Sequence, residues 1–179
     1  MIDPTILQPQ NIIPTKLSDL DFVGWLLEEA IVYQRKNGYS LWTNFDMDVI
    51  RNEIKTNSQY KILIENEIAC VFSVVFSDKV IWMEREIGDA LYLHRILVNP
   101  KHKGKRLFGE ILKWSISEAN NKNLAYIRMD TWGDNPSIIA YYKTFGFKFI
   151  CAITTPEDPE LAPHYWNKFL ALLEYEISE

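Results

Sequence analysis

The sequence is poor in the features that mark several protein classes. It contains only two cysteines and seven glycines in 179 residues. A disulfide framework is therefore not expected, and a reducing compartment fits. Both cysteines, Cys70 and Cys151, stand in apolar runs and are expected in the core. No apolar run approaches the ~20 residues of a membrane span, and the N-terminus lacks a signal-peptide pattern, so a cytoplasmic protein without membrane attachment is expected.

A positive net charge is also missing. The formal net charge is -5, which disfavours a general nucleic-acid binder, since such proteins need a basic surface. The charge is nevertheless uneven, because four basic residues fall within six positions, with no acid between Pro100 and Gly109. This basic island indicates either a local anion site or a solvated loop. Its members are Lys101, Lys103, Lys105 and Arg106.

Several nucleotide and metal motifs are absent as well. The sequence has neither the Gly-x-x-x-x-Gly-Lys-Ser/Thr pattern nor Gly-x-Gly-x-x-Gly, which disfavours a nucleoside triphosphatase and a nicotinamide enzyme. His102 and His164 have no partner at metal-ligand spacing, so no metal site is expected.

The first half of the chain predicts two helices followed by antiparallel strands. Residues 1–10 carry two prolines and indicate an irregular lead-in, and 11–15 a first strand that Pro14 limits to an edge. Ser18, with Asp21 in capping-box position, predicts a helix that ends at Asn37-Gly38. Thr43 with Asp46 repeats that signal before a shorter helix. Strands are then predicted at 60–64, 68–76, 80–83 and 91–98.

The second half alternates strands and helices. A long helix is predicted from about 105 to 123, and Asp134 or Asn135 caps another helix that begins at Pro136 and stops at Gly146. Such alternation is typical of parallel neighbouring strands joined by crossover helices. The fold class is therefore α/β (α+β), with a mixed sheet and helices on both faces. The remaining strands are predicted at 124–129, 147–153 and 172–177.

The segment from Leu91 to Gly109 contains a candidate phosphate site. A strand ends at Asn99-Pro100, a basic loop with Gly104 follows, and a long helix begins. Free backbone N–H groups and the dipole at a helix N-terminus favour a bound anion.

This segment, together with one downstream, resembles the GNAT superfamily of N-acetyltransferases. That family has a strand ending in Val-x-Pro, a loop Arg/Gln-Gly-x-Gly-x-Gly, and later Asn-x-x-Ala-x-x-x-Tyr-x-x-x-Gly-Phe, in which Ile138 here replaces the alanine. The resemblance covers about residues 11–155 and is strongest from 91 to 150. The matching residues are Val98, Pro100, Lys103, Gly104, Gly109, Asn135, Tyr142, Gly146 and Phe147.

The resemblance implies a splayed mixed sheet that binds acetyl-CoA in the opening between the strand ending at Val98 and the strand near Ile127. Main-chain groups of the first strand would pair with the pantetheine arm, and the loop would cradle the pyrophosphate. Tyr142 would protonate the departing thiolate. The residues implied for coenzyme binding are Ile96, Leu97, Val98, Lys103, Gly104, Lys105, Arg106, Leu107, Phe108, Gly109 and Asn135.

Two residues depart from the family pattern. Arg106 and Phe108 stand where the family has glycines, which allow a backbone to approach phosphate closely. Their Cβ atoms could narrow the cradle, whereas the Arg106 guanidinium could contact a phosphate.

The catalytic base has two candidates. Acetyl transfer needs a neutral amine, so a group must take a proton from the acceptor. Glu84, next to a polar loop, and His94, on the coenzyme-binding strand, are not separable from the sequence. Asp130 and Asp134 either receive a cationic amine or cap the following helix, the cap being preferred for Asp134. Strand alternation suggests that Arg95 or Arg128 pairs with Asp130.

The function predicted is direct transfer of an acetyl group from acetyl-CoA to a primary amine of a small molecule or peptide, without a metal. The alternatives are a non-catalytic acyl-CoA-binding or regulatory domain on the same fold, and an unrelated α/β domain whose loop binds another anion. The acyltransferase domain is expected at 11–155, with 156–179 adding a loop and the final strand. The apolar segment 165–170 packs either on this domain or on a second subunit, as in a homodimer.

Overall fold

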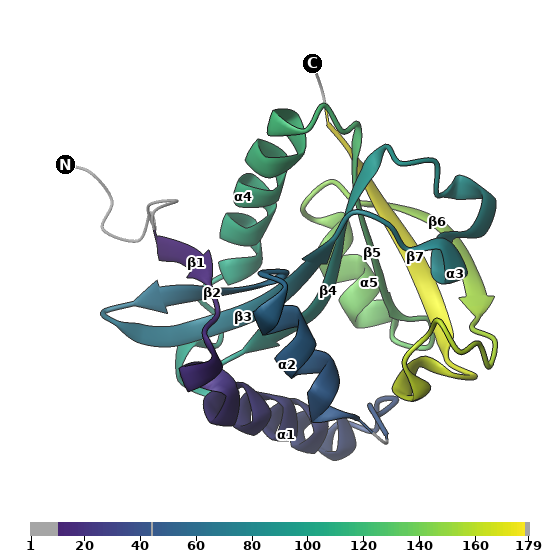
Figure 1. The fold of residues 1–179 in the computed structure, drawn as a ribbon. Helices are drawn as coiled ribbons and strands as arrows, with labels where there is room; N and C mark the ends of the chain where they lie inside the picture. Colours follow the sequence, from purple (N-terminus) through teal and green to yellow (C-terminus); the bar gives the residue numbers. More distant parts are fainter. Residues whose placement is uncertain (1–10, 44, 178–179) are drawn as a thin grey trace.

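The protein is described here by a computed structural model that covers residues 11–43 and 45–177. The expected lead-in at 1–10 lies outside the described residues. The chain forms a seven-stranded sheet in the order β1-β2-β3-β4-β5-β7-β6, with helices packed on both faces (Figure 1). One neighbouring pair, β4 with β5, is parallel and the other pairs are antiparallel. The predicted mixed sheet with helices on both faces is confirmed.

The first half follows the predicted order, but both helix starts differ from the prediction. The predicted cap at Ser18 is wrong: the Lys16 N–H donates to Asp19 at 2.8 Å, and one 3₁₀ turn precedes the helix. Asp46, rather than Thr43, caps the second helix by accepting from Asp48 N–H at 2.8 Å. The elements are β1 (Ile12–Pro14), α1 (Leu20–Lys36), α2 (Met47–Lys55), β2 (Gln59–Ile64) and β3 (Glu67–Val75).

The predicted strand at 80–83 is wrong. These residues form the short helix α3 (Lys79–Trp82) and the 3₁₀ turn η3 (Met83–Arg85). The run Val-Ile-Trp has strand-forming residues, but Ile81 and Trp82 are buried against Tyr92 and Leu172 on one face of the sheet, so tertiary packing overrides the local preference. After α3, the chain enters β4 (Ala90–Val98).

The second half contains the predicted strand–helix alternation, with one difference in topology. The last strand lies between β5 and β6 and is antiparallel to both. The prediction that β5 and β6 are parallel neighbours is therefore wrong. Figure 1 shows this strand in yellow between its two partners. The elements are α4 (Leu107–Asn121), β5 (Tyr126–Trp132), α5 (Pro136–Lys143), β6 (Lys148–Thr154) and β7 (Phe169–Glu176).

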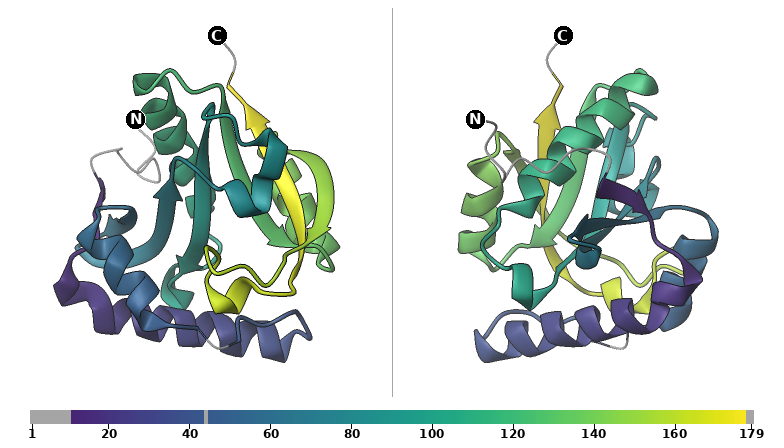
Figure 2. Two further views of the ribbon diagram at one scale, coloured as in Figure 1. Left: turned by 45° about the vertical axis from the view of Figure 1, so that its right-hand side comes forward. Right: turned by 90° about the vertical axis from the view of Figure 1, so that its left-hand side faces the viewer.

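The two faces of the sheet carry different helices. On one face, α4 and α5 pack on a core that contains Leu91, Leu93 and Met129. On the other face, α1 and α2 pack against Val71 and Leu97, and α3 with the segment before β7 forms a second cluster. Figure 2 shows α1 running across the lower ends of the strands. Successive side chains of a strand therefore point alternately to the α4–α5 side and to the α1–α3 side.

Of the two cysteines, Cys70 is buried and Cys151 is partly exposed, and neither forms a disulfide. Among the described residues, no helix combines the length and the apolarity that crossing a bilayer requires.

Candidate active site

A bulge in β4 creates the opening in the sheet. The ladder with β3 pairs Val71 with Leu97 and Ser73 with His94, so two residues of β4 oppose one of β3. The extra residue is accommodated at Arg95, whose φ of 47° is left-handed. The bulge also exchanges the faces: His94 is on the α1–α3 side, and two residues later Ile96 packs on the α4–α5 core.

Beyond the bulge, β4 and β5 separate. They pair from Ala90↔Tyr126 to Leu93↔Met129, after which β5 continues to Trp132 paired only with β7. The main chain of β4 after Leu93 therefore has no β5 partner and can bind an extended ligand. Residues 96–98, predicted to contact the coenzyme, lie in this unpaired part.

A cavity of about 730 Å³ lies at the opening. Its wall comes from the end of β4, the following loop, α5, the C-terminal half of α1 and the segment around η5 (Pro163–Tyr165). This volume is typical of a site for a small molecule or cofactor. Of the residues predicted for coenzyme binding, the cavity is lined by Ile96, Leu97, Val98, Lys103, Gly104, Lys105, Arg106, Leu107, Phe108 and Asn135, while Gly109 is not among the lining residues.

The loop between β4 and α4 has the geometry of an anion site. Gly104, with φ 85°, and Arg106, with φ 53°, turn the chain into α4. The helix begins at Leu107, so the first-turn N–H groups lack helical partners, although Gly109 N–H donates to Arg106 C=O at 3.0 Å. The Lys103 ammonium lies 3.8 Å from the centre of the Tyr33 ring, which ties the loop to α1.

The two departures from the glycine pattern have different consequences. Arg106 adopts the left-handed conformation that glycine would favour, so the backbone keeps that turn. Phe108 is 4% exposed, and its ring packs on Tyr142 at 4.8 Å and on Phe145 at 5.0 Å between ring centres. Its side chain therefore belongs mainly to the aromatic core beneath α5.

Helix α5 presents Asn135 and Tyr142 to the cavity. Asn135 is the N-cap, since its Oδ1 accepts from Ile138 N–H at 3.1 Å, so the preferred cap at Asp134 is wrong. Asp134 instead accepts from Ser40 Oγ at 2.7 Å. Burial raises the pKa of Tyr142 above its ordinary 10, which keeps the phenol protonated at neutral pH.

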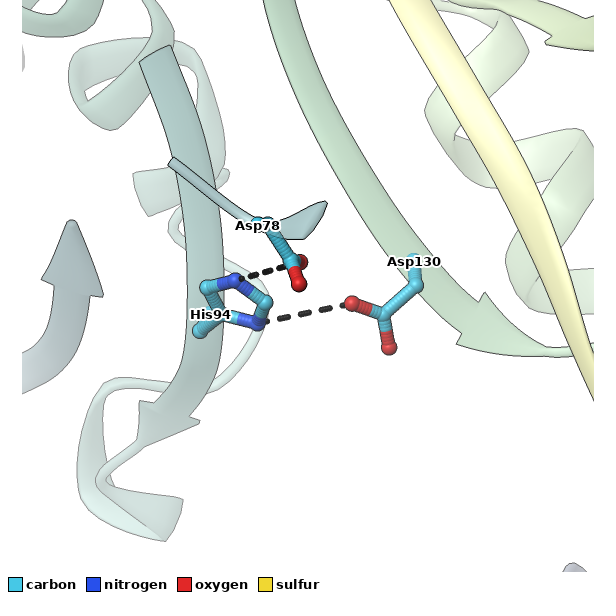
Figure 3. Close-up of side chains that lie close together, drawn as sticks. All are labelled: Asp78, His94 and Asp130. Atoms are coloured by element: carbon cyan, nitrogen blue, oxygen red, sulfur yellow. Dashed lines mark ion pairs between the residues drawn. The ribbon is translucent and has the colours of Figure 1, made fainter. Parts of the chain in front are cut away.

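His94 lies between two carboxylates in the gap between β4 and β5 (Figure 3). Its Nε2 is 3.2 Å from Asp78 Oδ2, and its Nδ1 is 3.4 Å from Asp130 Oδ1. Burial alone would lower the pKa of His94, but contact with Asp78 and the charge of Asp130 outweigh it, so the pKa is raised from its ordinary 6.5. Burial raises the pKa of Asp130 to about 6 although the His94 charge opposes it.

The geometry of this cluster is compatible with proton transfer at His94. One ligand atom from each of the three residues lies within 4.8 Å of the others, which a metal ion could in principle use. The carboxylates, however, face opposite nitrogens of the same ring (Figure 3). This arrangement fixes the imidazole and stabilises its protonated form, as in a proton relay.

The remaining sequence-based candidates lie elsewhere. Glu84 is exposed on η3 and does not line the cavity. The predicted pairing of Asp130 with an arginine is wrong, because Arg95 pairs with Glu53, and Arg128 pairs with Asp89 at 3.0 Å and with Glu174 at 2.8 Å.

Asp78 is a residue that the sequence analysis missed. Ser77-Asp78-Lys79 has only the signal of a turn, and nothing local indicates that this carboxylate contacts β4. Asp78 is brought to His94 by the packing of α3 on the sheet.

The comparisons with known proteins agree on one family. The family model described as "Acetyltransferase (GNAT) family" matches residues 39–147. An uncharacterized N-acetyltransferase of Bacillus subtilis, YesJ, is 22% identical over 147 residues, 78% of this chain and 82% of the relative.

Solved structures show the same fold. A GNAT-family acetyltransferase from Listeria monocytogenes superposes with a TM-score of 0.73 at 18% identity, covering 92% of this chain and 93% of the other. A putative acetyltransferase from Salmonella typhimurium, yncA, solved with its cofactor acetyl-CoA, has a TM-score of 0.64 at 14% identity and covers 94% of each chain.

Proposed function

Because the chain belongs to the GNAT acetyltransferase family, we propose that it transfers the acetyl group of acetyl-CoA directly to a primary amine. One observation carries the detailed proposal: Tyr142, His94 and the basic loop all line a single cavity where β4 and β5 separate. A donor for the sulfur, a base for the amine and an anion site for the coenzyme thus share one space.

The coenzyme is proposed to bind along β4 and at the start of α4. The main chain of residues 96–98, which pairs with β3 but has no β5 partner, pairs on its other edge with the amide groups of the pantetheine arm. The N–H groups of Lys103, Lys105 and Gly109 donate to carbonyls of the same segment, so the pyrophosphate lies against the other N–H groups from Gly104 to Phe108 and the side chain of Arg106. Asn135, whose Oδ1 is occupied by its helix cap, offers its amide N–H₂ to the coenzyme arm.

The reaction is proposed to proceed by direct attack. The acceptor enters as an ammonium and gives one proton to neutral His94. The nitrogen lone pair then forms the C–N bond at the thioester carbonyl, and the C–S bond breaks. Tyr142 gives its proton to the departing sulfur and is reprotonated as the nitrogen loses its second proton, so that one proton is released to solvent per amide formed.

The raised pKa values fit these roles. Tyr142 stays protonated until the thiolate forms. Asp78 and Asp130 stabilise the imidazolium that His94 becomes, because they lie at both ring nitrogens. Glu84, exposed and outside the cavity, has no part in this scheme.

The proposal is tested by thermal unfolding with and without acetyl-CoA, followed by an assay of CoA release over a panel of amines. Ligand at ~100 times its dissociation constant stabilises the fold by about 2.7 kcal/mol. Tyr142→Phe is expected to keep this stabilisation and to lower kcat by about 10²- to 10⁴-fold. The control is Tyr60→Phe, which changes a tyrosine that does not line the cavity.

Stabilisation by acetyl-CoA without release of CoA over the whole panel would favour a non-catalytic acyl-CoA-binding domain instead. Absence of stabilisation at millimolar coenzyme would contradict coenzyme binding itself.

A further inference from the structure

The end of the cavity next to His94, called the inner end below, combines one carboxylate with an apolar wall. Asp130 and Trp132 alternate with Met129 along β5 and so share the face opposite α4. Leu170 is the cross-strand partner of Trp132. Tyr165 contacts the same cluster, and its ring centre is 6.3 Å from that of His94.

Trp42 completes this wall from the segment between α1 and α2. It packs against the cluster that contains Trp132, Tyr165 and Leu170, and all four line the cavity. The wall is mainly apolar and lies at the same end as the His94 cluster. The acceptor wall is therefore defined by Trp42, Trp132, Tyr165 and Leu170.

The charge at this end is negative. The Asp130 side chain is 7% exposed, and its Oδ1, 3.4 Å from His94 Nδ1, makes no hydrogen bond with any of the described residues. Even when protonated, His94 offsets only one of the two carboxylates beside it, and the positive charge of Arg95 is paired with Glu53. A buried carboxylate without a full counter-charge is costly, so a cationic ligand is favoured at this position.

A second acid lines the cavity, but at its other end. Glu29 lies one turn before Tyr33 on α1, and the Tyr33 ring contacts Lys103 of the coenzyme loop. The inner end thus offers one carboxylate that is open to the cavity, since Asp78 is not a lining residue. One carboxylate with an apolar wall matches an acceptor that carries a single positive charge.

We infer that the acceptor is a primary ammonium on a compact apolar body, aryl or alkyl, whose cation binds to Asp130 and whose body lies against the acceptor wall. This inference rests on the proposed function, because it names the acceptor for the same site. Asp130 acts as a binding residue that holds the nitrogen beside His94. Longer polycations and peptides would have to desolvate further polar or charged groups against Trp42, Trp132 and Tyr165, with no second lining carboxylate at this end to pair with them.

Binding is measured first, with CoA present, by calorimetry. The probes are 2-phenylethylamine, its N,N-dimethyl derivative, spermidine, trialanine and 2-phenylethanol. The dimethyl derivative is a cation with one N–H at neutral pH and cannot form a stable amide. It therefore reports binding of the cation separately from the chemistry.

The two phenylethylammonium probes are expected to bind, and 2-phenylethanol, spermidine and trialanine are expected to bind about tenfold more weakly or worse. Asp130→Asn is expected to weaken binding of the dimethyl derivative by about 10- to 100-fold, while leaving that of CoA unchanged. The control is Asp21→Asn, which removes an exposed carboxylate from the first turn of α1. Asp130→Glu, which keeps the charge, is expected to retain part of the affinity.

Two outcomes overturn the inference. Stronger binding of spermidine or trialanine than of the phenylethylammonium probes would identify another acceptor class. An unchanged affinity in Asp130→Asn, with a normal unfolding midpoint, would remove Asp130 from the site. If the ammonium probes bind as expected but 2-phenylethylamine is not acetylated, the proposed reaction fails while the ligand site stands.

Discussion

Asp130 Oδ1 lies 3.4 Å from His94 Nδ1 across the gap that the β4 bulge opens. The two residues come from strands that pair only up to Leu93 and Met129, one position before each of them. The ion pair therefore lies immediately beyond the last residue pair of the β4–β5 ladder. Because His94 lines the cavity, a ligand there can reach its ring.

The rate is expected to depend on pH through His94. The groups that face its ring are Asp78, Asp130 and Tyr165, and the two carboxylates raise the pKa above 6.5, so the neutral base forms only above that value. We expect kcat/KM to rise with pH through an apparent pKa above 6.5 that belongs to the coupled cluster. Asp78→Asn should shift this rise to lower pH, and Asp21→Asn should not. A profile with the same midpoint in all three proteins would exclude His94 as the base.

Loss of the carboxylate of Glu53 is expected to be strongly destabilising. Glu53 pairs with Arg95, and both side chains are at most 9% exposed. Glu53→Ala leaves a buried guanidinium without its partner, which costs about 3–5 kcal/mol in unfolding free energy. The matched change is Asp48→Ala, which breaks the exposed pair with Arg51 and should cost less than about 1 kcal/mol. Urea denaturation measures the unfolding free energy of both variants. An equal loss of stability in the two would contradict a special contribution from burial.

The affinity for acetyl-CoA is expected to depend on the charge of Arg106. Asparagine tolerates the left-handed backbone at this position, so Arg106→Asn should keep the fold while removing the charge. We expect its dissociation constant for acetyl-CoA to rise by about tenfold at low salt and the difference from wild type to shrink at high salt. Calorimetry at two ionic strengths measures this. Equal affinities at low salt would show that Arg106 makes no phosphate contact.

His164 is expected to make the fold sensitive to acid. It is buried between Phe45 and Tyr165, and burial, with the charges of Arg95 and Lys168, lowers its pKa from 6.5 to about 4. In the unfolded chain this ring takes up a proton below 6.5, whereas in the folded protein it does so only near 4. The folded state therefore loses stability as the pH falls between these values, by at most about 1.4 kcal/mol per pH unit.

His164→Leu removes this titration. The unfolding free energies of wild type and variant, measured from pH 7 to pH 4, should converge or cross in favour of the variant as the pH falls. Parallel curves would show that His164 titrates alike in both states.

The sequence was most informative where a function depends on consecutive residues. The strand, basic loop and helix around Gly104 and the helix that begins at Pro136 follow from local signals, and the structure contains both, although the sequence favours Asp134 as the cap where the structure has Asn135. The parallel neighbours β4 and β5 follow from the intervening helix α4. These features depend on backbone geometry over a few consecutive residues, and the types of those residues indicate that geometry.

Contacts between distant segments were not predictable in the same way. Asp78 meets His94 only because α3 packs on the sheet, whereas the local sequence predicts a strand at 80–83. The partner of Arg95 lies on α2, and no local pattern distinguishes Glu53 from other acids. The position of β7 between β5 and β6 is likewise a matter of long-range pairing.

The order of the strands also has a consequence during synthesis. A chain emerging from the ribosome folds from its N-terminal part onward, but β6 has no partner in the sheet until β7 has been made. Until then the open edge of β5 is exposed, as is the apolar surface that Leu170 and Leu172 later cover. Because Tyr165 and Leu170 also line the cavity, the nascent chain cannot form a complete acceptor site before residue 170 has emerged. The stretch of translation between β6 and β7 therefore leaves both a strand edge and an apolar surface without their final cover.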